Sequence, residues 1–207
     1  MVAKVQQAKI ILASRSPRRR YLLEQAGLNF EVIPSRFDES LVPQEEPATY
    51  VQVLARAKAE DIAPHHPRSW VIGADTIVTI GRDILGKPQD HAIARDMLRR
   101  LSGQTHQVLT GWSVCCSSAG VVHTATVVTD VTFKTLSADE IEWYIHTGEP
   151  FDKAGAYAIQ GLGTFLVRRI NGSYTNVVGL PVCEVIEFLI EAKVVHIVGR
   201  EGESGPT

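Results

Sequence analysis

The chain has 207 residues, of which 44% are hydrophobic and 21% are charged, a composition typical of an ordinary soluble globular protein with one domain or two small lobes. Lysine and arginine number 21 against 23 aspartate and glutamate residues, giving a formal net charge of −2. That balance argues against broad coating of nucleic acid, which needs a surplus of cations, but it leaves room for a local basic pocket that holds a small anion.

The three cysteines, Cys115, Cys116 and Cys183, are odd in number and form no C-x-x-C pair. They therefore indicate neither a disulfide framework nor a zinc site, and we expect small buried side chains in a reducing compartment. No apolar run approaches the roughly 20 residues of a membrane span, and the N-terminus lacks a secretory pattern. We expect a cytoplasmic protein with no membrane partner and no nucleic-acid partner.

The first elements follow from short local signals. The apolar run 10–13 is too short for a helix and suits a buried strand. Ser16 is a good helix N-cap, Pro17 suits the first helical position, and Gly27 marks the stop. Residues 30–33 then predict a second strand.

The next segment alternates helices and strands. A helix is predicted over about 48–62, with apolar residues on one face, and Lys58 falls on that same face. A strand follows over 70–80, up to a turn at 81–83. A further helix is predicted over about 90–101.

The second half begins with two long antiparallel strands, 105–115 and 121–134, followed by a helix that opens with a capping box at Ser137. The pair Asn171-Gly172 predicts a hairpin between strands at 164–170 and 174–178.

After that hairpin we expect a final helix over 182–191 and a disordered tail at 199–207. This mixture of hairpins and strand-to-helix crossovers predicts an α/β fold: a mixed, partly antiparallel twisted sheet flanked by helices, with two lobes and a ligand cleft between them.

The segment 14–20 carries the strongest chemical signal. It places Ser14, Ser16 and several arginines at a strand-to-helix junction, where free backbone N–H groups favour anions, and the planar guanidinium group suits phosphate oxygens. Cations are mildly unfavourable at a helix N-terminus, so they need an offsetting partner. The sequence therefore favours an anion site, and a solvated basic turn is the alternative.

Other candidates are weaker on their own. Asp75 sits where a strand run ends in Gly73-Ala74, and a carboxylate beside small residues at a strand terminus could face a cleft. There it could hold a cation or take a proton from water; otherwise it is an ordinary turn residue. Asp38-Glu39 could supply oxygen ligands for Mg²⁺ or Mn²⁺, or lie in a solvated acidic loop. Lys58 could also extend to solvent. It and Lys87 become informative only if they converge on the same phosphates as Arg18 and Arg19.

Five motifs occur in order along the chain: Ser14-Arg15-Ser16-Pro17-Arg18-Arg19, Gly73-Ala74-Asp75-Thr76, Gly86-Lys87-Pro88, Leu101-Ser102-Gly103 and Asp152-Lys153-Ala154-Gly155-Ala156-Tyr157. Together they resemble the Maf-like nucleoside triphosphate pyrophosphatases over about residues 9–192. A single domain of that kind is expected over 9–198. Within the family, Gln160 resembles the dTTP/UTP branch, because the 7-methyl-GTP branch carries an acidic residue there.

The resemblance implies cleavage between the α- and β-phosphates of a nucleoside triphosphate, with Mg²⁺ or Mn²⁺ as cofactor. It makes Asp75 the general base, a metal ligand with Glu39, or both. The other implied roles are triphosphate binding by Ser14, Arg18, Arg19, Lys58 and Lys87, and base selection by Arg18, Thr76 and Gln160. Arg15 and Arg20 are extra cations with no role carried over.

Three rival hypotheses remain at this point. The substrate could be a modified pyrimidine triphosphate, or 7-methyl-GTP. The protein could also be a non-catalytic nucleotide-binding regulator of cell division and septum formation. A homodimer is expected from family analogy alone.

Overall fold

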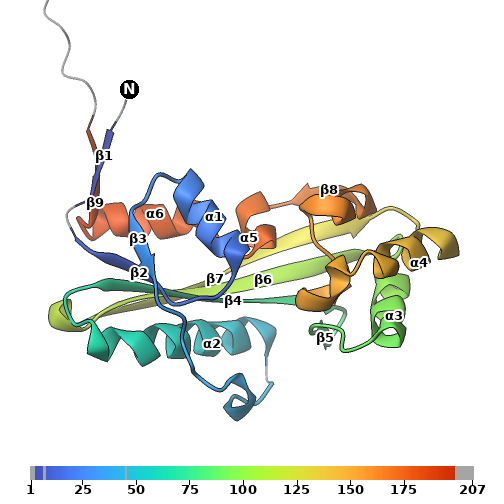
Figure 1. The fold of residues 1–207 in the computed structure, drawn as a ribbon, viewed down its shortest axis with the longest axis horizontal. Helices are drawn as coiled ribbons and strands as arrows, with labels where there is room; N and C mark the ends of the chain where they lie inside the picture. The colour runs from blue at the N-terminus through green and yellow to red at the C-terminus, as the bar shows by residue number, and fades with distance from the viewer. Residues whose placement is uncertain (1–2, 7, 45, 199–207) are drawn as a thin grey trace, which may run out of the picture.

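A seven-stranded mixed sheet runs along the length of the molecule (Figure 1). The structure is a computed structural model that describes residues 3–6, 8–44 and 46–198. The strands are β1 (Ala3–Gln6), β2 (Ile10–Leu12), β3 (Phe30–Val32), β4 (Trp70–Ile80), β5 (Asp83–Leu85), β6 (Thr105–Cys116), β7 (Val121–Phe133), β8 (Val167–Asn171) and β9 (Val195–Val198).

The order of strands in the main sheet is β3-β2-β4-β6-β7-β8, with β5 paired to β4. The strand β2 runs parallel to β3 and β4, and all other neighbours are antiparallel. The strands β1 and β9 form a separate two-stranded ribbon that stands off one end of the molecule (Figure 1). The expected mixed, partly antiparallel sheet is confirmed.

Helices cover both faces of this sheet. In Figure 1, α2 lies on one face, and α1, α5 and α6 lie on the other. The helices are α1 (Pro17–Gln25), α2 (Pro47–Ile62), α3 (His91–Leu101), α4 (Ala138–His146), α5 (Tyr174–Val178) and α6 (Val182–Glu191). No helix in the described part of the chain is long and apolar enough to cross a membrane.

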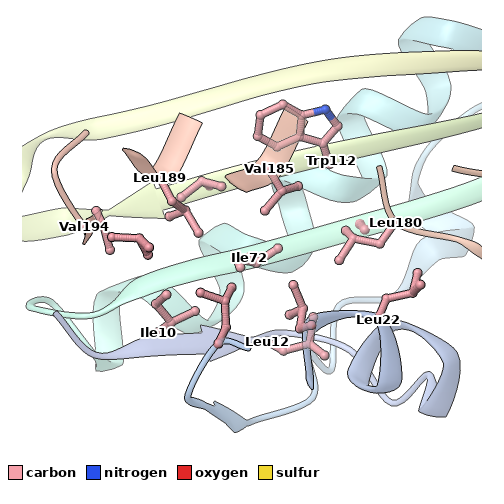
Figure 2. Close-up of a cluster of buried hydrophobic side chains, with 14 of the residues drawn as sticks. Ile10, Leu12, Leu22, Ile72, Trp112, Leu180, Val185, Leu189 and Val194 are labelled. Carbon is pink, nitrogen blue, oxygen red and sulfur yellow. The ribbon is translucent and has the colours of Figure 1, made fainter. Parts of the chain in front are cut away.

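The short strand β2 is buried on both faces, as its unbroken apolar run predicts. Ile10 and Leu12 point into the core beneath α1 and α6, together with Ile72, Val185 and their neighbours (Figure 2). Ile11 packs into a separate cluster on the α2 face. Because β2 is packed on both faces, its position in the sheet is held by the core.

Two glycines allow α2 to lie directly on the sheet. A Cβ atom on Gly73 of β4 would lie 2.2 Å from the carbonyl oxygen of Ala55, and one on Gly111 of β6 would lie 2.2 Å from that of Val51. Real Cβ contacts are never so short, so only glycine fits at these two positions. The close approach brings the C-terminal half of α2, with Lys58, against β4.

Two local predictions are wrong. The expected hairpin across Asn171-Gly172 does not form, because Ser173 caps the helix α5 in place of a second strand: its side chain accepts a hydrogen bond from the Asn176 amide. The first strand of that pair is also shorter than expected, since residues Gly161–Leu166 form a 3-10 turn.

The expectation of three buried cysteines holds for two of them. Cys115 and Cys116 are buried, whereas Cys183 is exposed. Cys183 lies on the outer face of α6, one turn from Glu187, whose carboxylate it contacts at 3.7 Å. The predicted tail, 199–207, lies outside the described residues.

Candidate active site

The sheet has an interrupted edge at the middle of β4. The strand β2 pairs with Trp70–Ile72 and β5 pairs with Val78–Ile80. In the described part of the chain no strand pairs with residues 73–77 on that side. A cavity of about 770 Å³ lies at this gap, and because successive residues of a strand point to opposite faces, Asp75 and Thr76 enter it from opposite sides of the sheet.

On the α2 side, a lysine joins two carboxylates. The ammonium of Lys58 lies 2.6 Å from Oδ1 of Asp75 and 2.7 Å from Oε1 of Glu39. The side chains of Lys58 and Asp75 are 12% and 14% exposed, whereas that of Glu39 is 55% exposed. Lys58 therefore does not extend to solvent, and it holds both predicted acids at the cavity wall.

The loop geometry explains why Glu39 and not Asp38 reaches this wall. Glu39 begins a short 3-10 turn, Glu39–Leu41, and Asp38 is its N-cap. The Asp38 carboxylate accepts hydrogen bonds from the amide and the hydroxyl of Ser40. The Asp38 carboxylate therefore forms hydrogen bonds within the turn, while Glu39 lines the cavity.

On the other face of β4, Arg19 is held in a fixed position. The first turn of α1 is set by Ser16, whose hydroxyl accepts from the Arg19 amide at 3.4 Å. The guanidinium group donates from Nε to the Gly179 carbonyl at 2.7 Å, from one terminal nitrogen to Ser14 Oγ at 3.2 Å, and from the other to Thr76 Oγ1 at 3.1 Å. Two of the five N–H donors remain for a ligand.

The charge of Arg19 follows from this setting. Burial lowers the pKa of the Arg19 guanidinium, and the Asp75 carboxylate opposes that shift. Arginine is effectively always protonated in proteins, so the group stays cationic at neutral pH. Arg19 is therefore a rigid, charged anchor with donors that still point into the cavity.

Arg18 reaches across the cavity mouth. Its terminal nitrogen lies 3.1 Å from Oδ2 of Asp152, which ends the 3-10 turn Glu149–Asp152 after α4. Asp152 also pairs with Lys153, whose ammonium donates to the Glu149 carbonyl at 2.7 Å. Burial alone would raise the pKa of Asp152, but hydrogen bonds from Lys153 and Arg18 lower it below its ordinary value.

Lys87 and Gln160 line the cavity from neighbouring loops. The amide of Gly155 donates to the carbonyl of Gly86 at 3.0 Å, which ties the Lys87 loop to the segment before Gln160. The turn after Gln160 is held by Glu149, whose carboxylate accepts from the amides of Leu162 and Gly163, both at 2.9 Å.

The structure brings every predicted site residue to this one cavity. These residues are Ser14, Arg18, Arg19, Glu39, Lys58, Asp75, Thr76, Lys87 and Gln160. Sequence reasoning missed Arg36, Asp152 and Lys153, which also line it. Asp152 and Lys153 belong to one of the five motifs, although no role was assigned to them. Nothing in the sequence marks Arg36.

The charge of the wall suits a polyanion. Seven of the lining residues are cationic and three are anionic, a surplus of four positive charges in a chain whose net charge is −2. Arg15, Arg36 and Lys87 have no ion-pair partner among the described residues. Such a concentration of charge in a cleft attracts phosphate groups and orients them.

The donor set also fits a divalent cation that is shared with phosphates. Glu39 and Asp75 converge on one point, which the Lys58 ammonium occupies. Among the described residues no group of three or more histidine, cysteine, aspartate or glutamate side chains could hold a metal. Mg²⁺ is commonly held by one or two carboxylates together with substrate phosphates, so two carboxylates are sufficient.

The fold and the cavity together define an α/β protein with a cationic, acid-bearing cleft at an interrupted sheet edge. The sequence model for "Maf-like protein" matches residues 9–192, and the chain belongs to this family.

Known relatives cover nearly the whole chain. It is 49% identical over 197 residues to a dTTP/UTP pyrophosphatase of Syntrophus aciditrophicus (strain SB), covering 95% of this chain and 96% of the relative. It is 53% identical over 182 residues to a dTTP/UTP pyrophosphatase of Geotalea uraniireducens (strain Rf4), covering 88% and 94%.

A solved structure shares the fold at low identity. The Staphylococcus aureus Ham1 protein aligns with a TM-score of 0.51 and 13% identity, covering 89% of this chain and 99% of that one. This likeness supports the architecture of the sheet and its helices.

Proposed function

We propose that this chain is a nucleoside triphosphate pyrophosphatase that converts dTTP and UTP to the nucleoside monophosphate and pyrophosphate. The observation that carries the proposal is the meeting of Asp75, Glu39 and Lys58 at one wall of a cavity that also holds Arg18, Arg19 and Lys87. The relatives named dTTP/UTP pyrophosphatase support the substrate.

The reaction needs a base and a charged wall. Water attacks the α-phosphorus while its proton passes to the Asp75 carboxylate, and the bond between the α-phosphorus and the bridging oxygen to the β-phosphate breaks. The products are the monophosphate, pyrophosphate and one proton. Asp75 is suited to this step because Lys58 fixes Oδ1, while Oδ2 has no partner among the described residues.

The cations stabilise charge that grows on the leaving group. Arg19 is preorganised by three protein contacts, so it binds phosphate without further ordering. Arg18 and Lys87 stand at the mouth and approach the same phosphates, and Ser14 holds one arm of Arg19. A divalent cation bound by Glu39 and Asp75 would neutralise phosphate charge and polarise the attacked phosphoryl group.

Base selection requires hydrogen bonds. The amide of Gln160 offers one donor side and one acceptor side, which matches the imide edge of uracil or thymine. Thr76 and Arg18 line the same cavity and complete the proposed selecting set. Modified pyrimidine triphosphates with the same edge would also be accepted, which gives the protein a role in clearing nucleotide pools.

The location and assembly are further parts of the proposal. All three cysteines are free, which suits the reducing cytoplasm. A homodimer stays a prediction from the family.

The deciding experiment is pyrophosphate release from a panel of triphosphates with and without Mg²⁺ or Mn²⁺. We expect release from dTTP and UTP to exceed that from dCTP, dGTP and 7-methyl-GTP. Preference for 7-methyl-GTP would assign the chain to the sister branch. Binding without release would identify a nucleotide-binding regulator instead of an enzyme.

A further inference from the structure

A line of hydrogen bonds leads from the cavity into the sheet behind it. Thr76 of β4 and Thr110 of β6 are direct cross-strand partners, and their hydroxyl oxygens lie 2.9 Å apart. Thr110 Oγ1 also lies 3.0 Å from the carbonyl oxygen of Asn176 in α5. Thr110 is fully buried, does not line the cavity, and belongs to none of the five motifs.

Counting protons gives this line a direction. A carbonyl oxygen only accepts, so the bond to Asn176 uses the single proton of the Thr110 hydroxyl. Thr110 must then accept from Thr76. Thr76 in turn accepts from a terminal nitrogen of Arg19 at 3.1 Å. The donors therefore run one way, from the guanidinium group through two hydroxyls to a backbone carbonyl.

The opposite direction is weaker. It would have Thr110 donate to Thr76 and Thr76 donate to the Gly179 carbonyl, which lies 3.4 Å away and already accepts from Arg19 at 2.7 Å. In either direction the protein takes the one proton of Thr76. The hydroxyl of Thr76 therefore offers the cavity no donor, and in the favoured direction one of its two lone pairs stays free for a ligand.

The face of β4 that carries Thr76 is suited to a base. Ile159 and Val178 line the cavity there and pack against the same apolar cluster as Ala74, which points to the same face of β4 as Thr76. The carboxylates of Asp75 and Glu39 meet Lys58 on the opposite face. An apolar wall with a few placed polar groups is the usual environment of a planar ligand ring.

We propose that Thr110 is a positioning residue that fixes the polarity of Thr76, so that the cavity favours a base carrying a proton at that point. Uracil and thymine carry a hydrogen at N3, whereas N3 of cytosine is a bare acceptor. Thr110 thereby disfavours cytosine nucleotides, although it touches no ligand. This inference rests on the proposed function and adds a residue to its selectivity.

Binding of uncleavable nucleotides tests the inference. The dissociation constants of the α,β-methylene analogues of dTTP and dCTP are measured by calorimetry on the full chain, for the wild type, Thr110→Val and Thr110→Ser. Valine keeps the shape and removes the hydroxyl, which frees the proton of Thr76. We expect the preference for the dTTP analogue to fall about threefold to tenfold in Thr110→Val, the worth of one hydrogen bond, and to be retained in Thr110→Ser.

A matched control removes a similar bond elsewhere. Thr105 lies on the same strand, its hydroxyl is 2.8 Å from that of Thr132 on β7, and it does not line the cavity. Thr105→Val should leave the preference unchanged.

Three results would overturn the inference: an unchanged preference in Thr110→Val, an equal loss in Thr110→Ser, or a wild type that prefers neither analogue. A ratio of two constants from one preparation does not depend on how much of that preparation is folded. The proposed function is judged separately by pyrophosphate release from natural dTTP and UTP. A chain that binds but does not cleave would contradict the proposed function and leave this comparison intact.

Discussion

The ammonium of Lys58 lies 2.6 Å from Oδ1 of Asp75, and fewer than one sixth of either side chain is exposed. Because Lys58 also binds Glu39 at 2.7 Å, losing the charge at position 75 would not leave the lysine unpaired. Asp75 can therefore be replaced without leaving a buried cation unpaired. An unpaired buried charge is the usual reason why breaking such a pair unfolds a protein.

Asp75→Asn should lower kcat for dTTP about 10²-fold to 10⁴-fold, the typical worth of a general base, while nucleotide binding changes little. Pyrophosphate release and calorimetry measure the two effects. Asp83→Asn is the matched control, since Asp83 pairs with Arg100 and does not line the cavity. Retained turnover in Asp75→Asn would exclude this residue as the base.

Removal of divalent cations with a chelator should abolish turnover, and added Mg²⁺ should restore it. Glu39→Gln should raise the Mg²⁺ concentration that gives half-maximal activity by about tenfold or more, because even groups that only orient a metal ligand are worth about 10-fold to 100-fold in affinity. Asp38→Asn is the control, since asparagine also caps helical turns. An unchanged Mg²⁺ requirement in Glu39→Gln would remove Glu39 from the metal site.

Gln160→Glu should reduce kcat/KM for dTTP and UTP relative to 7-methyl-GTP by about tenfold or more, because a carboxylate cannot donate to an oxygen of the pyrimidine edge and leaves a buried group unpaired. Competition between the two triphosphates in one reaction measures the ratio directly. The same ratio in both proteins would show that selection lies in other residues.

His106 should make the protein less stable in mild acid. It is buried on β6, its Nε2 lies 2.8 Å from the Tyr157 hydroxyl, and burial lowers the pKa of His106 to about 4. An unfolded histidine has a pKa of about 6.5, so between these values the unfolded state binds more protons and stability falls as pH falls. Urea unfolding at several pH values should show this slope, and His106→Gln should flatten it.

His65→Gln, the same substitution at an exposed histidine, is the matched control for that measurement. A profile in which His106→Gln retains the full slope would mean that acid destabilisation comes from other groups.

Gly111→Ala should destabilise the fold by about 1–3 kcal/mol or more, the usual cost of overpacking, because its methyl group would meet the Val51 carbonyl of α2 at 2.2 Å. A displaced α2 would also carry Lys58 away from Asp75, so kcat should fall with stability. Thermal unfolding measures the first effect. At Gly86 a methyl group meets open space, and Gly86→Ala should leave the melting temperature nearly unchanged.

Local signals in the sequence predicted most elements because the helix caps that they specify form within a few residues. Ser16 caps α1 and Ser137 forms a capping box with Glu140, as their spacing indicates. The Asn171-Gly172 signal failed because a competing cap at Ser173 was stronger in context: the Asn176 side chain is drawn into the sheet, where it donates to Val108 and Thr129. A tertiary contact therefore outweighed a turn preference.

The chemistry of the cavity depended on contacts that no local pattern contains. Arg18 and Asp152 are separated by 134 positions, and nothing in either segment specifies the other. The pairing of Lys58 with two acids likewise depends on how closely α2 lies on Gly73. The family resemblance gathered the right residues, but only the fold explains why they meet.

The alternation along β4 makes the catalytic proposal sensitive to strand alignment. Asp75 and Thr76 occupy opposite faces of the same strand, and their places are fixed by pairing with Gly111 and Thr110 of β6. A slip of one residue would exchange the two faces, sending the acid toward Arg19 and the hydroxyl toward Lys58. A single-residue insertion within this stretch would therefore abolish the proposed pyrophosphate release, even in a chain that still folds.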